Sequence, residues 1–140
     1  MDVVFLIGRV LFGVLFVYSG FGHFAAREAM QGYARQAGAP APAVTVPLTG
    51  LVIIVSGLAV ILGVLPDLAA LLIAGFLLLT AFIIHAFWRV EDPQMRQMEQ
   101  IQFSKDLALA GAALVLFYTW NQLQGDAGLS ITDPLFGRGD

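Results

Sequence analysis

Long apolar stretches alternate with short polar segments along most of this chain. The stretches lie at about residues 3–24, 46–65, 68–88 and 103–120, the last being continuously apolar only from 107 onward. Within the uninterrupted parts, only Arg9, His23 and His85 can carry a full charge. About 20 consecutive apolar residues span the hydrocarbon core of a bilayer as a helix. The pattern therefore predicts an all-α fold, an integral membrane four-helix bundle with up-down-up-down topology.

The polar segments set the predicted domain organisation. The second connection is little more than Pro66 and Asp67, which predicts a tight antiparallel hairpin. The third connection, from Arg89 to about Gln102, is polar and rich in Gln and Met. Residues 1–123 are expected to form the transmembrane domain. Residues 124–140 contain several Gly and Pro residues and are expected to form a polar C-terminal tail.

The first connection is longer and covers about residues 25–45. Its first half, residues 26–36, is compatible with a short interfacial helix that turns Met30 and Tyr33 toward the lipid. Pro40 and Pro42 then favour an extended segment before the second long helix.

Composition excludes several classes of protein. The chain is 59% hydrophobic and 12% charged, whereas soluble domains carry about 25% charged residues. The net charge is −3 and no basic run is present, so nucleic acid is not an expected partner. The chain has no cysteine, which excludes disulfides, thiolate metal sites and a cysteine nucleophile. No phosphate loop, nucleophile elbow or metal signature occurs, so neither a catalytic residue nor a metal site is predicted.

Basic residues are distributed unevenly between the connections. Five fall in or beside the first and third connections: Arg27, Arg35, Arg89, Arg96 and Lys105. The second connection has none, and the tail has only Arg138. The positive-inside rule therefore predicts that the first and third connections are cytoplasmic and that both termini lie outside.

Glycine recurs along the predicted helices. Gly50 and Gly57 are seven residues apart and share one helix face. Small residues let helix backbones approach closely in lipid, where no hydrophobic drive brings helices together. We therefore expect this face to pack tightly against another helix rather than to form a ligand groove.

The predicted topology brings polar residues from four helix ends to one membrane surface. They are His23, Thr45, Thr49, His85, Ser104, Lys105 and Asp106. An ionisable residue within a membrane is by default a functional-site hypothesis, because its burial is costly without a partner. The proposed partners are Asp106 for His85, and Ser19 or Thr49 for His23.

Three interpretations of the two histidines stay open. They can share a metal or haem, they can hydrogen-bond a quinone carbonyl, or they can satisfy one another or lipid headgroups. Phe24, Phe82, Phe87 and Trp88 would wall a quinone site. The resulting ligand-binding hypothesis comprises His23, Thr49, His85, Trp88 and Asp106.

The remaining polar residues have structural interpretations. Arg9 lies near the opposite surface, where Asp67 is its possible ion-pair partner. Ser104 is expected to cap the fourth helix, while Asp106 complements the positive end of that helix and Lys105 lies beside it.

Four short segments also form a set that resembles a known family. They are GRVLFG at 8–13, SGFGHF at 19–24, GAP at 38–40 leading into the glycine-spaced helix at 50–63, and LTAFIIH at 79–85 ahead of FSKDLALAG at 103–111. Over about residues 7–116 the chain resembles the DoxX family of small bacterial membrane proteins. Two features differ, because that family often has a lysine where this chain has His23 and a glutamate in the second helix, where this chain has residues 51–55 without one.

The resemblance implies a multi-pass protein of the bacterial inner membrane that is associated with quinone-linked redox systems. The expected role is a partner-dependent membrane subunit that is not catalytic alone, with no intrinsic cofactor and with a quinone as the candidate bound ligand. The alternatives are a structural accessory subunit of a larger respiratory or transport complex, and a bundle that binds lipid or a small ligand. The expected partners are the lipid bilayer and either other membrane subunits or further copies of this chain.

Overall fold

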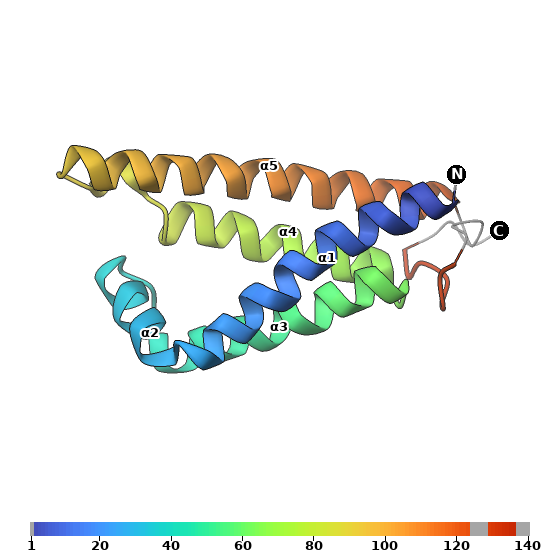
Figure 1. Ribbon diagram of the computed structural model, residues 1–140, viewed down its shortest axis with the longest axis horizontal. Helices are drawn as coiled ribbons and strands as arrows, with labels where there is room; N and C mark the ends of the chain where they lie inside the picture. Colours follow the sequence, from blue (N-terminus) through green and yellow to red (C-terminus); the bar gives the residue numbers. More distant parts are fainter. Residues whose placement is uncertain (1, 124–128, 137–140) are drawn as a thin grey trace.

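The fold is a bundle of long helices, seen in a computed structural model that describes residues 2–123 and 129–136 (Figure 1). Its elements are α1 (Asp2–Ala25), α2 (Arg27–Gln36), α3 (Pro42–Leu62), α4 (Pro66–Ile83), the 3₁₀ turn η1 (Phe87–Arg89) and α5 (Pro93–Leu123). The four helices α1, α3, α4 and α5 are long and apolar enough to cross a membrane, α4 together with the segment up to Arg89. The predicted all-α membrane bundle is confirmed.

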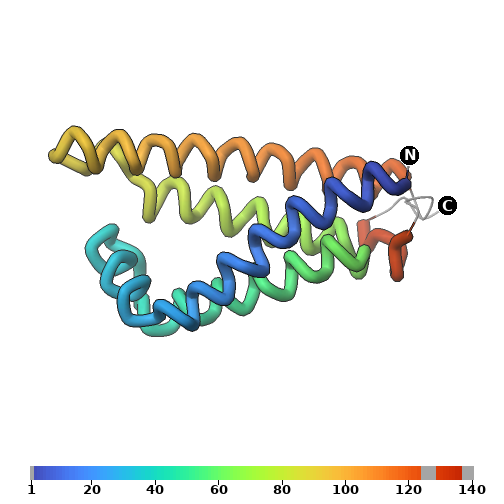
Figure 2. The backbone as a smooth tube through the Cα atoms, in the orientation of Figure 1, coloured from blue at the N-terminus to red at the C-terminus, as the bar shows by residue number. Residues whose placement is uncertain are grey.

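The four long helices form two close pairs. α1 packs along α3, α4 packs along α5, and α3 joins the pairs by packing against α4. The pairs lie together at the end where α1 begins and spread apart toward the end that carries α2 (Figures 1 and 2). The bundle is therefore a wedge that opens toward the first and third connections.

Glycine contacts hold α1 against α3. A Cβ atom at Gly13 would lie 2.6 Å from the carbonyl oxygen of Gly57, and one at Gly20 would lie 2.7 Å from that of Gly50. Any side chain at these positions would push the two backbones apart. The close packing predicted for Gly50 and Gly57 is thus confirmed.

Two helices begin several residues earlier than the apolar pattern indicated. α5 begins at Pro93 rather than near residue 103, because Asp92 caps it by accepting a hydrogen bond from the Met95 amide at 2.8 Å. α3 begins at Pro42, a residue expected in an extended segment. Proline is tolerated in the first helical turn, because the N–H that it lacks has no intrahelical partner there.

The narrow end of the wedge is fastened by Arg9, which is fully buried. Its Nε donates to the Val60 carbonyl at 3.0 Å and its Nη2 to the Ile61 carbonyl at 2.7 Å, both in the last turn of α3. Its Nη1 lies 3.4 Å from the carbonyl oxygen of Leu129 and from Oγ of Ser130.

Asp67 holds the same C-terminal segment and does not pair with Arg9. Its carboxylate accepts hydrogen bonds from the backbone amides of Leu135 at 2.9 Å and Phe136 at 2.6 Å. No ion pair joins Arg9 to Asp67 in residues 2–123 and 129–136. The predicted pair is replaced by two separate anchors for residues 129–136, a segment of the predicted polar tail. Residues 124–128 and 137–140 of that tail lie outside the described residues.

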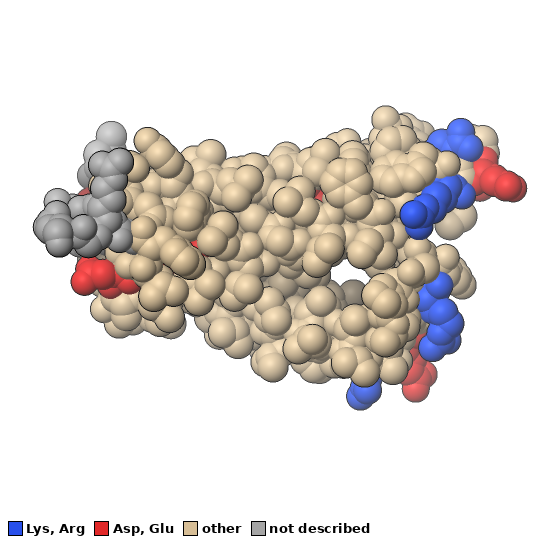
Figure 3. Space-filling model, turned by 180° about the vertical axis from the view of Figure 1, so that it is seen from behind, with Lys and Arg blue, Asp and Glu red and all other residues tan. Residues whose placement is uncertain are grey.

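The outer faces of the helices carry large apolar side chains. Leu11, Leu51, Leu79 and Val115 are among those that are more than half exposed. Lys and Arg side chains gather instead at the wide end of the wedge, over the first and third connections (Figure 3). This distribution is the one expected of a bundle surrounded by lipid, with one strongly polar end.

Candidate functional site: a cavity between the helix pairs

The open part of the wedge contains a cavity of about 640 Å³. All five α-helices contribute to its wall, which is mostly apolar and includes Leu15, Phe16, Val52, Phe76 and Leu109. The molecular surface is visibly hollowed next to the basic end, between the α2 region and the α4–α5 connection (Figure 3). Cavities of about 300–1,000 Å³ with apolar walls and a few polar groups are typical ligand sites.

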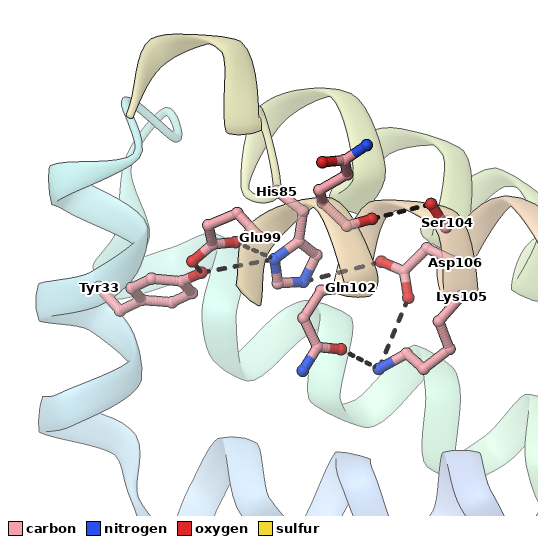
Figure 4. A network of polar contacts seen from close by, with 8 residues as sticks. Tyr33, His85, Glu99, Gln102, Ser104, Lys105 and Asp106 are labelled. Atoms are coloured by element: carbon pink, nitrogen blue, oxygen red, sulfur yellow. Dashed lines mark hydrogen bonds and ion pairs between the residues drawn. The ribbon is translucent and has the colours of Figure 1, made fainter. Parts of the chain in front are cut away.

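A row of polar side chains crosses the wide end of this cavity (Figure 4). The Tyr33 hydroxyl donates to Oε1 of Glu99 at 2.5 Å, and Oε2 of Glu99 lies 2.7 Å from Nδ1 of His85. Nε2 of His85 lies 3.7 Å from Oδ2 of Asp106, whose Oδ1 lies 3.9 Å from Nζ of Lys105. The row connects α2, the α4–η1 segment and α5 across the gap between the two helix pairs.

Glu99 influences where the protons lie on its two neighbours, His85 and Tyr33. Because an ionised carboxylate only accepts hydrogen bonds, the contact with Glu99 assigns a proton to Nδ1 of His85. Burial and the neighbouring carboxylates raise the pKa of Tyr33 above its usual value of 10.0. Tyr33 therefore stays a neutral hydroxyl that donates to Glu99.

Asp106 is the most buried acid in this row. It is 4% exposed, and neither of its oxygens accepts a hydrogen bond from any described residue. The 3.7 Å separation from His85 is an electrostatic contact and too long for a hydrogen bond. A buried carboxylate without hydrogen-bond donors is costly, so this residue has unused capacity to bind a donor.

His23 lines the cavity from α1, away from the row. It is 6% exposed, and its Nδ1 lies 2.9 Å from the Ser19 carbonyl, which can only accept. Nδ1 therefore carries the proton, and Nε2 of the neutral ring is left without a hydrogen bond in the described part of the chain. The ring of Phe76, 6.2 Å away between centroids, packs beside it.

Two findings relate this chain to known proteins. The DoxX family model matches residues 4–86, more than half of the chain. The inner membrane protein YqjF of Escherichia coli (strain K12) is 33% identical over 118 residues, which cover 84% of this chain and 85% of that protein. The chain belongs to the DoxX family. No solved structure matches it.

In this DoxX-family protein, the cavity brings together most of the polar residues selected from the sequence. His23, Thr45, Thr49, His85, Lys105 and Asp106 all line it. The proposed partner Ser19 accepts from His23 through its backbone carbonyl. Asp106 lies near His85, but Glu99 rather than Asp106 fixes the tautomer of that ring.

Other expected positions are corrected by the structure. Ser104 is not a helix cap, because α5 begins at Pro93, and its hydroxyl donates to the Gln100 carbonyl within the helix. For the same reason Asp106 lies in the interior of α5 and cannot complement its N-terminal end. Trp88 is absent from the cavity wall and packs in an aromatic cluster with Phe82, Phe87 and Phe103.

The first connection of the DoxX-family chain also differs from expectation. It does contain a helix, α2, but Met30 and Tyr33 line the cavity instead of facing lipid. The location of α2 at the membrane interface stays a prediction. Likewise, α4 ends at Ile83, earlier than the predicted stretch 68–88, so His85 follows this helix and does not lie within it.

Glu99 and Tyr33 were missed as site residues. Glu99 lies in the segment interpreted as a polar connection, and the Asp92-Pro93 start signal was the clue that it belongs to a helix. Within the described residues, no group of three His, Cys, Asp or Glu side chains is arranged to hold a metal ion.

Proposed function

We propose that this DoxX-family chain is a membrane subunit that binds a quinone-type ligand in the cavity between its helix pairs. The observation that carries the proposal is the combination of a largely apolar space of about 640 Å³ with polar groups collected at one end. A quinone needs this combination, because its ring and tail are apolar while its two oxygens form hydrogen bonds. The ring oxygens would lie near His23, His85 and Asp106.

The polar residues of the site have distinct proposed roles. His23 and Thr49 present hydrogen-bonding atoms from α1 and α3, and Asp106 and Lys105 do so from α5. Glu99 and Tyr33 position His85, since each touches its neighbour at hydrogen-bonding distance. They are positioning residues because they act on the ligand through the imidazole.

The proposed role depends on a partner. The chain has no cysteine and no signature of a resident redox group, so electrons exchanged with a bound quinone must pass to or from another subunit. The YqjF relative is named an inner membrane protein, which supports the bacterial inner membrane as the location of this chain. The basic residues at the wide end support a cytoplasmic position for the first and third connections.

Quinone binding by the purified protein tests this proposal. A short-chain benzoquinone and the corresponding hydroquinone would each be titrated against the detergent-solubilised protein, with His23→Ala and His85→Ala as site variants. Thr119→Val is the matched control, because that hydroxyl bonds to the Val115 carbonyl on an exposed surface outside the cavity. We expect saturable binding, and hydroquinone binding that weakens about tenfold in either histidine variant, as the loss of a hydrogen bond from the ligand hydroxyl to the imidazole implies.

Two results would contradict the proposal. Absence of saturable binding by the folded wild-type protein would show that a quinone is not the ligand of this cavity. Equal affinity of wild type, His23→Ala and His85→Ala would show that the ligand does not bind beside the two histidine rings.

A further inference from the structure

We infer that the cavity selects the reduced, hydroxyl-bearing form of its ligand, a hydroquinone, over the oxidised quinone. This inference rests on the proposed function and specifies the chemical form of the ligand. The two forms share nearly the same shape, but a hydroquinone can donate two hydrogen bonds, whereas quinone oxygens only accept. The preference is therefore set by which kind of hydrogen-bonding group the cavity leaves free.

Three of the five hydroxyl groups in the cavity wall already donate to protein acceptors. The Tyr33 hydroxyl donates to Glu99, that of Thr45 to the Pro40 carbonyl at 3.0 Å, and that of Thr49 to the Thr45 carbonyl at 2.8 Å. The Thr45 and Thr49 oxygens each keep a free lone pair and no proton for a ligand, whereas the Tyr33 oxygen also lies 3.4 Å from Nδ1 of His85. Ser19 and Thr80 also line the cavity, and their hydroxyls serve either a donor or an acceptor.

The histidine on α1 also offers an acceptor. Because Nδ1 of His23 donates to the Ser19 carbonyl, Nε2 has only its lone pair to offer when the imidazole is neutral. No described side chain occupies that lone pair. A ligand hydroxyl can donate to it, whereas a quinone carbonyl would bring two lone pairs together.

Asp106 supplies the strongest acceptor. Its carboxylate lies in the cavity wall, is more than nine-tenths buried, and accepts no hydrogen bond from the described residues. A hydrogen bond to a charged acceptor contributes about twice as much as one between neutral groups. When Asp106 is ionised, a ligand hydroxyl that donates to it gains that contribution, and a ligand carbonyl is repelled.

Lys105 is the wall residue that most favours the oxidised ligand, because its ammonium group can donate to a quinone carbonyl. Its Nζ hydrogen-bonds to the Gln102 side chain and faces Asp106 at 3.9 Å, which leaves one N–H for a ligand carbonyl. His85 is engaged with Glu99 through Nδ1, and its Nε2 faces Asp106. Besides the two uncommitted hydroxyls of Ser19 and Thr80, the wall therefore offers one free cationic donor. Its free acceptors lie on His23, Thr45, Thr49 and Asp106.

Anaerobic titration of the full-length protein in detergent tests the inference. The first ligand pair is a decyl-substituted benzoquinone and its hydroquinone. The second is a redox-inactive pair, 4-nonylphenol and its methyl ether, which differ only in the ability to donate. We expect the hydroquinone and the phenol to bind about tenfold more tightly than their partners, as one charge-assisted hydrogen bond implies.

Asp106→Asn separates donor recognition from shape. The carboxamide keeps the size of the side chain but loses the charge and presents N–H donors, so the preference should fall about tenfold or reverse. Glu28→Gln is the matched control, because this exposed carboxylate lies at the same end of the molecule but outside the cavity wall. If Asp106→Asn fails to fold, the affinities of the wild-type protein for the two ligand pairs still test the preference for the reduced form.

The outcomes separate this inference from the proposed function. Binding of both forms with equal affinity, or tighter binding of the quinone, overturns the selectivity but leaves a quinone site in place. Binding of neither form overturns both statements. Tighter binding of hydroquinone and phenol, abolished in Asp106→Asn but not in Glu28→Gln, supports both.

Discussion

At the scale of single residues, the buried Arg9 closes the narrow end of the wedge. Its guanidinium meets the carbonyls of Val60 and Ile61, which belong to the last turn of α3 and have few intrahelical donors. A cation at a helix C-terminus also complements the helix dipole. The rings of Phe5 and Trp120, 5.6 and 5.8 Å from the guanidinium carbon, extend its contacts to α5.

Removing this charge should loosen the bundle. We predict that Arg9→Met lowers the free energy of unfolding by about 2–4 kcal/mol, because two buried carbonyls lose charged donors. Arg9→Lys should lie between, since lysine keeps the charge but lacks the planar fork that reaches two carbonyls at once. Thermal unfolding in a mild detergent measures both variants, and unchanged melting of Arg9→Met would contradict the capping role.

Some residue-level features were predictable from the sequence and others were not. Charged and polar groups within apolar stretches singled out His23 and His85, and both lie in the cavity wall. The sequence could not reveal that Glu99 reaches His85, because that contact depends on the helical extension of α5 beyond its apolar part. Nor could it exclude the Arg9–Asp67 pair, since both residues bind a distant backbone segment.

At the scale of helices, glycine pairs decide how α1 meets α3. Gly13 faces Gly57 and Gly20 faces Gly50, so the two backbones touch at two levels of the bundle. This tight pair forms one wall of the cavity, and the α4–α5 pair forms the other. A change in its spacing would alter the shape of the cavity as well as the stability.

A single methyl group tests this contact. We predict that Gly57→Ala destabilises the protein by about 1–3 kcal/mol, because the new Cβ would lie 2.8 Å from the Gly13 carbonyl oxygen. Gly111→Ala is the matched control on α5, where a Cβ meets nothing within 4 Å and should be neutral or stabilising. Equal unfolding curves for the two variants would show that α1 and α3 are not held by this contact.

Helix positions followed from the apolar pattern, whereas helix ends did not. Hydrophobic length marks only the part of a helix that lies in lipid, so the polar first turns of α5 looked like a connection. The helix begins where Asp92 and Pro93 provide a cap and a tolerated first residue. Local capping chemistry, and not hydropathy, fixes such boundaries.

At the scale of the whole molecule, the wedge links the fold to the proposed ligand. The helix pairs meet at the end held by Arg9 and diverge toward the basic end, which leaves space for a cavity beside polar groups. The topology was predictable from the alternation of spans and connections. The divergence was not, because it results from contacts between distant segments that no local pattern records.

Photo-crosslinking with an azido-substituted quinone, followed by peptide mass spectrometry, tests the central claim most directly. We predict that the label attaches to cavity residues such as Met30, Phe76 and Leu109, and that unlabelled hydroquinone competes for these positions. Labels confined to outward-facing positions such as Leu51 and Val115, with no competition, would show that quinone only dissolves in the surrounding detergent or lipid. That result would contradict a ligand site between the helix pairs.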